Sequence, residues 1–493
     1  MEYNTLGAVD LGSNSFHLAI GRVDGDQIYP LDSLKEAVRL GGGVTRDKQL
    51  TADVQERALE ALKRFSERLA GMPRQSVRAV GTNALRVSKN AGAFLREAQK
   101  TLGFPIEVIS GREEARLIYL GVLHSLPLST ENRLVVDIGG GSTEFIIGNG
   151  PETRAVESLY MGCVSYTNKY FPDGKIDKKS MKQAELAARE EVQAIAARYE
   201  KVGWKEAVGS SGTAKSLAEA LVLNGQDESG ITADGLDWLK GALVDAGDVK
   251  KVSIPGLREE RLPVIAGGVA IMSAVFRELG LESMTVADGA LRQGVLWDLL
   301  GRVHRADIRD VTVERLVKRY HVDQVQAERV QKLATTLLAE LEAATGDPLV
   351  DMERYLAWAA RLHEIGISIA QGAYHKHSAY ILANADMPGF SRQEQGWLSN
   401  LVLSQRGKLG KMHAAFADDP RLAAQAFCLR LAVIFNRSRR EPKLPAIHVS
   451  RKAEEFRLSI DPAWLEENTL VALALEAERD HWREAGLGFE ITL

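Results

Sequence analysis

Short apolar runs alternate with amphipathic stretches over roughly the first 300 residues. Runs at 6–9, 77–80 and 106–109 are apolar and rich in β-prone side chains, which predicts buried strands. Between them, apolar residues recur every three or four positions, as they do over 51–69, which predicts helices that each bury one face. This regular alternation predicts an α/β fold of sheets covered by helices.

One apolar-to-polar pattern occurs twice. Residues 10–15 read Asp-Leu-Gly-Ser-Asn-Ser after the apolar run 6–9, and residues 137–142 read Asp-Ile-Gly-Gly-Gly-Ser after the apolar run 134–136. Both copies continue into β-prone residues and then reach a glycine. Each copy predicts a strand, a tight turn and a second strand. The repeat therefore predicts a duplicated α/β unit in which each copy starts with a hairpin.

The pattern changes near residues 302–310. From 312 to about 436 it is mostly helical, and a linker with two prolines follows at 441–445. The remaining residues predict two strands, one helix over 462–484 and a last strand. The predicted domains are two α/β domains over 1–123 and 124–305, a helical domain over 306–440 and a small α/β domain over 441–493.

Composition narrows the class of protein. With 62 basic and 66 acidic residues the net charge is −4, which excludes a strongly basic protein that coats nucleic acid, and we expect no nucleic-acid partner. An apolar fraction of 45% excludes a disordered chain. The two cysteines, Cys163 and Cys428, exclude a disulfide framework and suit a reducing cytoplasm.

The longest uncharged stretch, 262–276, is too short to span a membrane and contains Pro and Gly. The first residues lack the basic and apolar regions of a secretory signal. We therefore expect a cytoplasmic protein without an integral membrane segment, and the sequence leaves peripheral membrane association open.

The glycine turns are candidate phosphate sites, because glycine lets backbone N–H groups approach an anion closely. Asp10 and Asp137 stand at predicted strand ends, where a carboxylate can hold Mg²⁺ directly or through water. A pair of plain hairpin turns is the alternative. A strand-to-helix loop at 209–213 is a weaker anion site. The candidate phosphate-binding residues are Gly12, Ser13, Asn14, Ser15, Gly139, Gly140, Gly141, Ser142, Gly209, Ser210, Ser211, Gly212 and Thr213.

Two neighbouring glutamates open a predicted helix after the strand at 106–109. Glu113 and Glu114 point about 100° apart on a helix, so only one of them needs to face a cleft, where it could act as a general base on water. The alternative is an acidic helix start favoured by the helix dipole. Arg86 follows the strand at 77–80 and could pair with a phosphate, or it could be a solvated surface arginine.

The standard nucleotide motifs are absent. The glycines at 139–141 do not continue as G-x-G-x-x-G, and the chain holds no G-x-x-x-x-G-K-[ST], so neither a Rossmann nor a P-loop site is expected. His363-Glu364 resembles the His-Asp pair of metal phosphohydrolases with Glu in place of Asp. We favour a structural or substrate-contact role there over a metal site.

Basic residues gather late in the chain and could line a path for a polyanion. A solvated charged face is an equally good interpretation. The residues concerned are Arg406, Lys408, Lys411, Arg437, Arg439 and Arg440.

Several collinear motifs together resemble the exopolyphosphatase / guanosine pentaphosphate phosphohydrolase family. They lie at 10–17, 81–86, 110–117, 137–144, 161–164, 209–213, 288–292 and 375–380. The resemblance implies two duplicated actin/hexokinase-like (ribonuclease H-like) domains, an all-α domain related to His-Asp phosphohydrolases and a small α/β domain. It also implies that a late helix near 289–300 returns to the first domain, and that the active site lies between domains one and two.

The resemblance also implies roles for single residues. Glu114 would activate water, Arg86 would contact phosphate, and Asp137 and Glu144 would position metal and water. With Asp10, the last two form the candidate metal set for Mg²⁺, and a monovalent cation such as K⁺ is left open.

The activity implied is that of a phosphoanhydride hydrolase. Residues 137–142 and 287–289 favour processive removal of terminal phosphate from inorganic polyphosphate. Hydrolysis of guanosine pentaphosphate is the alternative, and a non-catalytic sensor of polyphosphate or alarmone is a lower one. A kinase of the actin fold that acts on a sugar or on acetate is a further alternative. The resemblance leads us to expect a homodimer.

Overall fold

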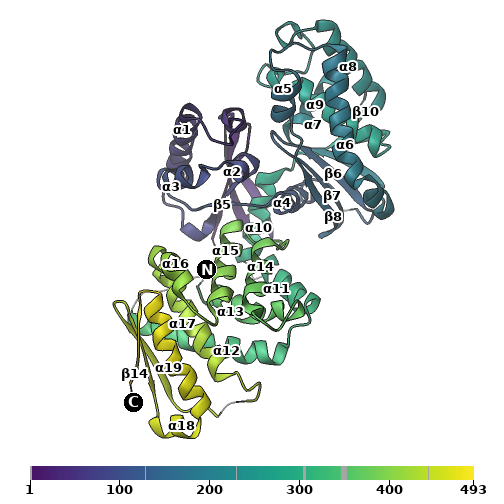
Figure 1. The fold of residues 1–493 in the computed structure, drawn as a ribbon. Helices are drawn as coiled ribbons and strands as arrows, with labels where there is room; N and C mark the ends of the chain where they lie inside the picture. The colour runs from purple at the N-terminus through teal and green to yellow at the C-terminus, as the bar shows by residue number, and fades with distance from the viewer. Residues whose placement is uncertain are drawn as a thin grey trace. The chain divides into compact units, whose positions relative to one another are not determined.

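The structure is a computed structural model that describes residues 3–127, 129–228, 230–303, 307–345, 352–441 and 443–492. The chain divides into two compact units, Met1–Asp307 and Ile308–Leu493 (Figure 1).

The first sheet of unit Met1–Asp307 has the strand order β3-β2-β1-β4-β5. The hairpin strands β1 (Thr5–Leu11) and β2 (Phe16–Asp24) are antiparallel, and β3 (Gln27–Glu36) extends them. The strands β4 (Val77–Gly81) and β5 (Ile106–Val108) continue the sheet in the direction of β1. The first predicted hairpin is therefore confirmed.

The second sheet repeats this order. Its strands are β6 (Arg133–Ile138), β7 (Thr143–Asn149), β8 (Glu152–Leu159), β9 (Glu206–Ser210), β10 (Ile231–Thr232) and β11 (Ser283–Val286). They run β10-β11-β9-β6-β7-β8, which matches the first sheet once the short edge strand β10 is set aside. Asp10 pairs with His17 across the first hairpin, and Asp137 pairs with Glu144 at the same place in the second. The duplication predicted from the repeat is confirmed, and the two sheets form the actin/hexokinase-like fold.

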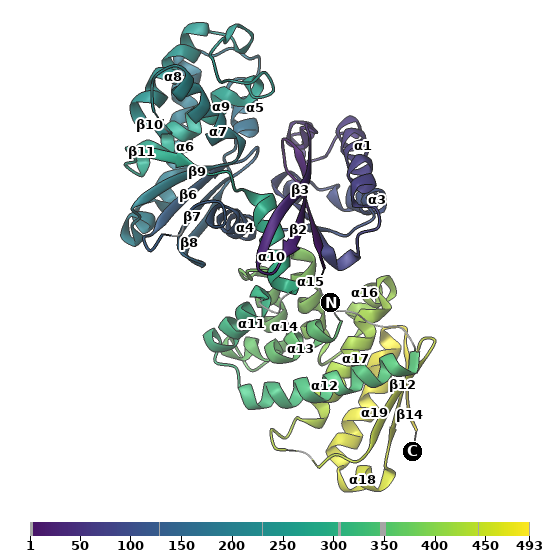
Figure 2. The ribbon, with the colours of Figure 1, turned by 180° about the vertical axis from the view of Figure 1, so that it is seen from behind.

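Helices α4 (Gly111–Leu123) and α10 (Leu291–Val303) lie between the two sheets (Figures 1 and 2). Alternation along the strands explains this layer, because successive side chains of a strand point to opposite faces. Leu6 and Ala8 of β1 share one apolar core with α4, α10 and the facing side of the second sheet. Val9 and Leu11 point the other way, toward the helices α1 (Ala52–Leu69) and α3 (Ala91–Leu102).

The outer face of the second sheet carries the other helices of this unit. They are α5 (Cys163–Tyr170), α6 (Lys178–Val202), α7 (Ser211–Leu223), α8 (Ala233–Ala246) and α9 (Leu262–Glu278), and the short helix α2 (Asn83–Val87) follows β4 in the first half. Helix α9 packs against α5, α6 and α8. Every residue from Ile265 to Phe276 is buried. The long uncharged stretch is therefore accounted for by packing inside the protein. None of the described helices is long and apolar enough to cross a bilayer.

Close packing joins α4 to α10. A Cβ atom on Gly294 would lie 1.7 Å from the Leu117 carbonyl oxygen, and one on Gly121 would lie 2.2 Å from the Ala290 carbonyl oxygen. Only glycine permits such an approach of two helix backbones.

A buried ionic cluster adds to this contact. The Asp298 carboxylate on α10 accepts hydrogen bonds from Arg78 at 2.7 Å, from Arg116 at 2.5 Å and from Arg302 at 2.9 Å. Arg116 also pairs with Glu113 at 2.8 Å. The three arginines hold the pKa of Asp298 well below its usual range despite the burial of the carboxyl.

The second unit contains helices and one small sheet around a shared apolar core. The helices are α11 (Ile308–Arg319), α12 (Gln324–Thr345), α13 (Met352–Leu362), α14 (Tyr374–Asn384), α15 (Arg392–Ser404), α16 (His413–Asp418) and α17 (Pro420–Phe435). The sheet order is β12-β13-β14, with bounds Ile447–Lys452, Glu455–Ile460 and Gly488–Thr492.

One predicted helix of this unit is two helices. The chain breaks at Asn468 into α18 (Pro462–Glu467) and α19 (Thr469–Glu484), because Asn468 leaves the helical conformation at φ −114° and ψ 55°. The same core contains side chains of α12, α17, β13 and α19. The domain boundaries at 123, 305 and 440 stay predictions.

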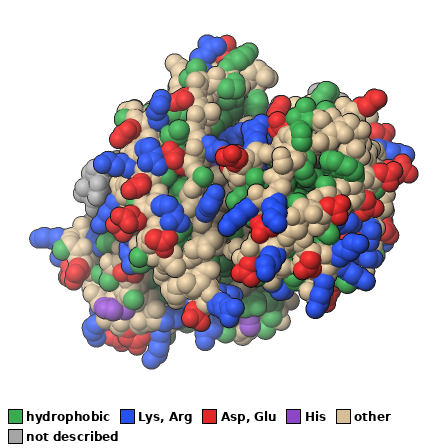
Figure 3. All heavy atoms as spheres, turned by 90° about the horizontal axis from the view of Figure 1, so that it is seen from above, with side chains coloured by type: hydrophobic (Ala, Val, Ile, Leu, Met, Phe, Trp, Pro, Cys, Tyr) green, Lys and Arg blue, Asp and Glu red, His purple; other side chains and the backbone are tan. Residues whose placement is uncertain are grey.

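The basic and acidic residues are nearly equal in number, with a net charge of −4, and this balance is visible on the surface. Basic and acidic side chains are interspersed over the face that Figure 3 shows.

Loss of the Asp298 charge tests the cluster. We expect Asp298→Asn to lower the free energy of unfolding by about 3–5 kcal/mol, because it leaves buried arginines without their common partner. Asp480→Asn is the matched control, since Asp480 is paired with Arg483 on the surface and its loss should matter by less than about 1 kcal/mol. Calorimetry of both full-length variants gives the comparison, and equal effects would contradict the assigned role.

Candidate active site

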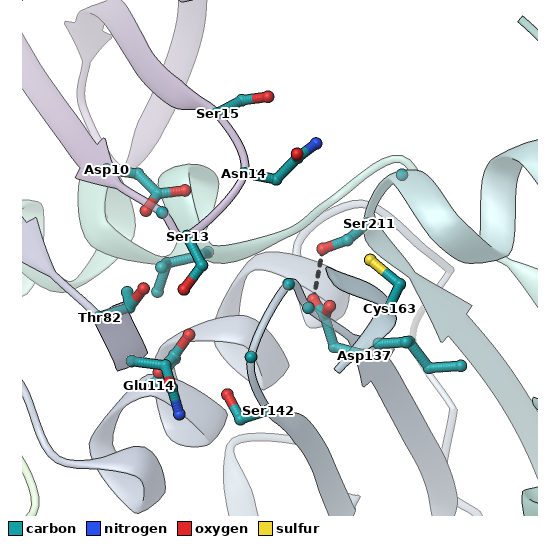
Figure 4. A pocket seen from close by; sticks show the side chains of 18 of the residues that line it. Asp10, Ser13, Asn14, Ser15, Thr82, Glu114, Asp137, Ser142, Cys163 and Ser211 are labelled. Atoms are coloured by element: carbon teal, nitrogen blue, oxygen red, sulfur yellow. Dashed lines mark hydrogen bonds between the residues drawn. The ribbon is translucent and has the colours of Figure 1, made fainter. Parts of the chain in front are cut away.

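A cleft opens between the two glycine turns in unit Met1–Asp307 (Figure 4). It encloses about 680 Å³, counting its open mouth. Its described lining is polar for the most part. The lining residues are Asp10, Gly12, Ser13, Asn14, Ser15, His17, Thr82, Asn83, Glu114, Ile118, Asp137, Ile138, Gly139, Gly140, Gly141, Ser142, Glu144, Cys163, Ser211, Gly212, Arg261 and Leu291.

Both turns are held from behind by backbone hydrogen bonds. Amides of residues 41 and 39 donate to the carbonyls of Ser13 at 2.7 Å and Asn14 at 2.8 Å. The first amides of α5 donate to the carbonyls of Gly139 at 2.9 Å and Gly140 at 3.0 Å. With these carbonyls engaged elsewhere, the turns can present N–H groups to an anion.

The turns also approach each other closely. A Cβ atom on Gly140 would lie 2.9 Å from the Cβ of Ser13. A larger residue in the second turn would therefore displace the first, and glycine there keeps the two candidate phosphate loops side by side.

Helix α4 places one of its two first-turn glutamates in the cleft. The Ser110 hydroxyl caps the helix by accepting from the Glu113 amide at 3.1 Å. Glu113 turns toward Arg116 and the Asp298 cluster, whereas Glu114 lines the cleft. Because neighbouring residues on a helix point about 100° apart, Glu113 can take part in the ionic cluster while Glu114 faces the cleft.

Arg86 has a different immediate partner from the phosphate that the sequence suggests. Its Nη1 donates to Glu114 Oε2 at 2.7 Å and to the Ile109 carbonyl at 3.0 Å. Arg86 is buried and is not among the lining residues. In this structure its Nη1 orients the Glu114 carboxylate.

The second hairpin contributes two further carboxylates. Asp137 accepts a short hydrogen bond from the Ser211 hydroxyl, and Glu144 accepts one from Ser158 at 2.8 Å. Ser211 has a φ of +63°, a left-handed conformation that a serine adopts only when its surroundings impose it.

The loop at 209–213 is divided between the cleft and the core. Ser211 and Gly212 line the cleft. Gly209 lies under Met284, the Ser210 hydroxyl donates to the Gly289 carbonyl at 3.0 Å, and the Thr213 hydroxyl donates to the Ile138 carbonyl at 3.0 Å. These last three residues hold the loop and do not face the cleft, contrary to the prediction for the whole loop.

Burial and mutual repulsion raise the pKa values of three carboxyl groups in the cleft. Burial, helped by Glu114 and Asp137, raises the pKa of Asp10 to about 8. Burial also raises the pKa of Asp137 to about 6 against the Ser211 hydrogen bond, and it raises that of Glu144 well above its usual value.

These residues are suited to a hard cation that brings its own ligands. Asp10 Oδ1 is buried and makes no hydrogen bond. Among the described residues no three acidic, His or Cys side chains converge as a complete metal site. Mg²⁺ usually takes one or two carboxylates and completes its octahedron with water and phosphate oxygens, so Asp10 with Asp137 or Glu144 fits it.

Several lining residues lie outside the predicted set. Thr82 and Asn83 belong to the motif at 81–86, and Cys163 to the motif at 161–164, so the sequence held a signal for each. Arg261 had none, because the first turn of α9 brings it to the cleft from far along the chain. A Cβ atom on Gly212 would lie 1.6 Å from its Nη2, so the guanidinium rests on that glycine.

The predicted basic residues lie in the other unit, and two of them are close to Tyr374. The Arg406 guanidinium stacks on the Tyr374 ring at 5.1 Å. Burial raises the pKa of that tyrosine, and the charges of Arg406 and Arg439 act in the opposite direction. Arg439 pairs with Glu364 at 2.6 Å and with Asp323 at 3.1 Å. Arg439 thus takes part in two ion pairs within its own unit.

The other basic residues of the set are exposed to solvent, as Arg439 is. Lys408 lies 3.5 Å from Glu484, and Arg406, Lys411, Arg437 and Arg440 are exposed. His363 is buried, and its Nδ1 lies 2.6 Å from the Ala360 carbonyl oxygen.

The raised pKa of Asp10 predicts a pH effect on stability. Below about pH 3.8 the carboxyl is protonated in both states; up to about pH 8 only the folded state keeps the proton, so stability falls as pH rises. Asp10→Asn removes this dependence. We therefore compare the Tm of Asp10→Asn with that of the unsubstituted protein, both in the presence of a chelator. We expect the Tm of the variant minus that of the unsubstituted protein to be larger near pH 9 than near pH 5. Calorimetry at both pH values tests this, and a constant difference would contradict it.

Comparison with known proteins agrees with the fold. A model of the Ppx/GppA phosphatase family matches residues 19–303, and a model of domain III of Ppx/GppA phosphatases matches residues 308–479.

Solved structures add three relatives. An exopolyphosphatase from Cytophaga hutchinsonii is 27% identical with a TM-score of 0.55, over 60% of this chain and 98% of its own. An exopolyphosphatase-like protein is 25% identical with a TM-score of 0.54, over 61% and 98%. The PPX-GPPA enzyme of Aquifex aeolicus is 28% identical with a TM-score of 0.49, over 59% and 98%. The two family models together span most of the sequence, and this chain belongs to the Ppx/GppA phosphatase family.

Proposed function

We propose that this chain is an exopolyphosphatase that removes terminal phosphate processively from inorganic polyphosphate. The observation that carries the proposal is the position of Glu114, which faces a cleft between two glycine turns opposite Asp137 and Glu144. Phosphoryl transfer needs positioning, charge neutralisation and an in-line water more than covalent chemistry. In this proposal the two turns supply the positioning, a bound cation supplies the charge neutralisation and Glu114 directs the water.

Glu114 is the proposed general base. Its Oε2 is held by Arg86, which leaves the rest of the carboxylate to accept a proton from water as the water attacks the terminal phosphorus. The shortened polyphosphate leaves on the opposite side. The two turns hold the oxygens of the reacting phosphoryl group through N–H and hydroxyl donors.

Mg²⁺ is the proposed cofactor. Asp10, Asp137 and Glu144 would hold it, and when bound it would neutralise phosphate oxygens and lower the barrier to displacement. The chain's own residues supply the water-activating base and the donors.

Polyphosphate suits the cleft better than a nucleotide does. The described lining residues include no Phe, Tyr or Trp on which a purine could stack. The exopolyphosphatase of Cytophaga hutchinsonii is consistent with this choice. Guanosine pentaphosphate remains the second candidate, because the phosphate-handling residues would serve both substrates.

The exposed basic residues near Tyr374 are proposed to hold long chains. Arg406 and Lys411 are exposed and belong to the unit that does not contain the cleft. A short substrate would not need them, whereas a long polyanion gains contacts from any further cationic surface that it reaches.

The first test replaces the base. We expect Glu114→Gln to lower phosphate release from long-chain polyphosphate by about 100- to 10,000-fold, as loss of a general base does. Glu113→Gln is the matched control on the same helix turn, and its activity should persist wherever the variant is folded. Unchanged turnover in Glu114→Gln would rule out Glu114 as the base.

The same assay with Mg²⁺ compares long-chain polyphosphate, guanosine pentaphosphate and ATP. Preference for polyphosphate supports the proposal. Preference for the pentaphosphate assigns the site to that substrate, and tight binding without turnover of any of them indicates a sensor.

The second test concerns chain length. We expect the double charge reversal Arg406→Glu/Lys411→Glu to lower kcat/KM for long chains about tenfold at low salt and to leave short chains within about twofold. Lys332→Glu/Lys452→Glu is the control, since both lysines are exposed in the same unit. Equal losses on long and short chains would remove the proposed role.

A further inference from the structure

Two buried side-chain atoms among the residues lining the cleft make no hydrogen bond. One is Asp10 Oδ1, an acceptor, and the other is Asn83 Nδ2, a donor. Buried polar groups nearly always have a partner, and an exception at a site indicates a group that a ligand completes. The acceptor suits a cation, which leaves the donor to be explained.

Asn83 lies where the two glycine turns meet. It is 8% exposed and begins the helix α2 directly after β4. The next amide, that of Ala84, donates to the Ser13 hydroxyl in the first turn at 3.2 Å. In the second turn, a Cβ atom on Gly141 would lie 2.6 Å from Asn83 Oδ1. The Asn83 amide is therefore confined between the two turns.

Several other polar groups nearby already have partners. The Ser13 hydroxyl accepts from Ala84, and the Ser211 hydroxyl donates to Asp137. Arg86, three residues after Asn83 on the same short helix, is bound to Glu114. Asn83 Nδ2 differs from these groups because it is a buried nitrogen that makes no hydrogen bond at all.

A neutral donor suits this position. Four carboxylates line the cleft, and a cationic side chain here would pair with one of them, as Arg86 does. An amide N–H carries no charge to be captured, so it stays available for a phosphate oxygen. Hydrogen bonds from neutral donors to charged acceptors are among the stronger ones.

We propose that Asn83 is a substrate-binding residue whose Nδ2 donates a hydrogen bond to an oxygen of the phosphoryl group held between the two turns. This inference rests on the proposed function, because it takes the bound group to be a phosphate. It adds a second residue of the motif at 81–86 to the phosphate contact that the sequence suggested for Arg86.

The test separates binding from folding. Asn83→Leu keeps the branching of the side chain and removes the donor. In the Glu114→Gln background, which prevents turnover, we expect Asn83→Leu to weaken the Kd for tripolyphosphate with Mg²⁺ about 10- to 100-fold by calorimetric titration. In the otherwise unsubstituted protein we expect a similar loss of kcat/KM on polyphosphate.

Stability distinguishes a binding role from a structural one. A buried donor without a partner destabilises the ligand-free protein, so Asn83→Leu should leave its Tm unchanged or raise it. Ser88→Ala is the control, because it loosens the other end of α2 by removing the bond from Ser88 to the Ala84 carbonyl at 2.7 Å without changing the cleft. We expect that control to bind tripolyphosphate as before.

Two results would overturn the inference: an unchanged Kd in Asn83→Leu, whatever its Tm, or an equal loss of binding in Ser88→Ala. Failure of the proposed function has a different signature. In that case the Glu114→Gln protein does not bind tripolyphosphate, and the protein with an intact Glu114 releases no phosphate from polyphosphate.

Discussion

The close approach of α4 and α10 between the two sheets is the constraint on which the site depends. Glycines remove the Cβ atoms that would separate the helices, and Asp298 collects three arginines at their contact. Buried charges are stable together and costly when one is missing, so the cluster defines one rotation of α4. In that rotation Glu113 is used for structure and Glu114 reaches the cleft.

That rotation brings a fourth carboxylate to a place that already holds three. In a poorly hydrated cleft, like charges so close cannot all ionise without help. Arg86 stabilises Glu114, while Asp10, Asp137 and Glu144 respond by holding protons to higher pH. A cleft in this state favours a ligand that brings compensating positive charge and accepts hydrogen bonds, as a magnesium-bound phosphate chain does.

Local pattern was sufficient for part of this arrangement. The repeated Asp-apolar-Gly turn predicted both hairpins, since a tight turn between two strands is encoded within a few residues. The spacing of Glu113 and Glu114 predicted only that one of them needed to face a cleft, and the one that does is decided by contacts with Asp298, nearly two hundred residues away. Arg261 was missed for the same reason, because its place is decided by the packing of α9.

Other differences have equally particular causes. The partner of Arg86 could not be read from its motif, since a guanidinium binds a carboxylate as readily as a phosphate. The loop at 209–213 was taken as one anion site, yet only Ser211 and Gly212 turn toward the cleft. The break at Asn468 interrupts a stretch whose apolar periodicity continues on both sides, so periodicity alone did not reveal it.

The duplicated hairpins differ at one paired position, and that difference gives the cleft its polarity. Opposite Asp137 stands Glu144, whereas opposite Asp10 stands His17. Burial, aided by Arg292, Lys35 and Arg261, lowers the pKa of His17 to about 3, so the imidazole is neutral at physiological pH. The first hairpin therefore presents one carboxylate and the second presents two. The two hairpins thus share the same turn and differ in charge, so the proposed anion would meet two similar turns and an unequal share of acidic groups.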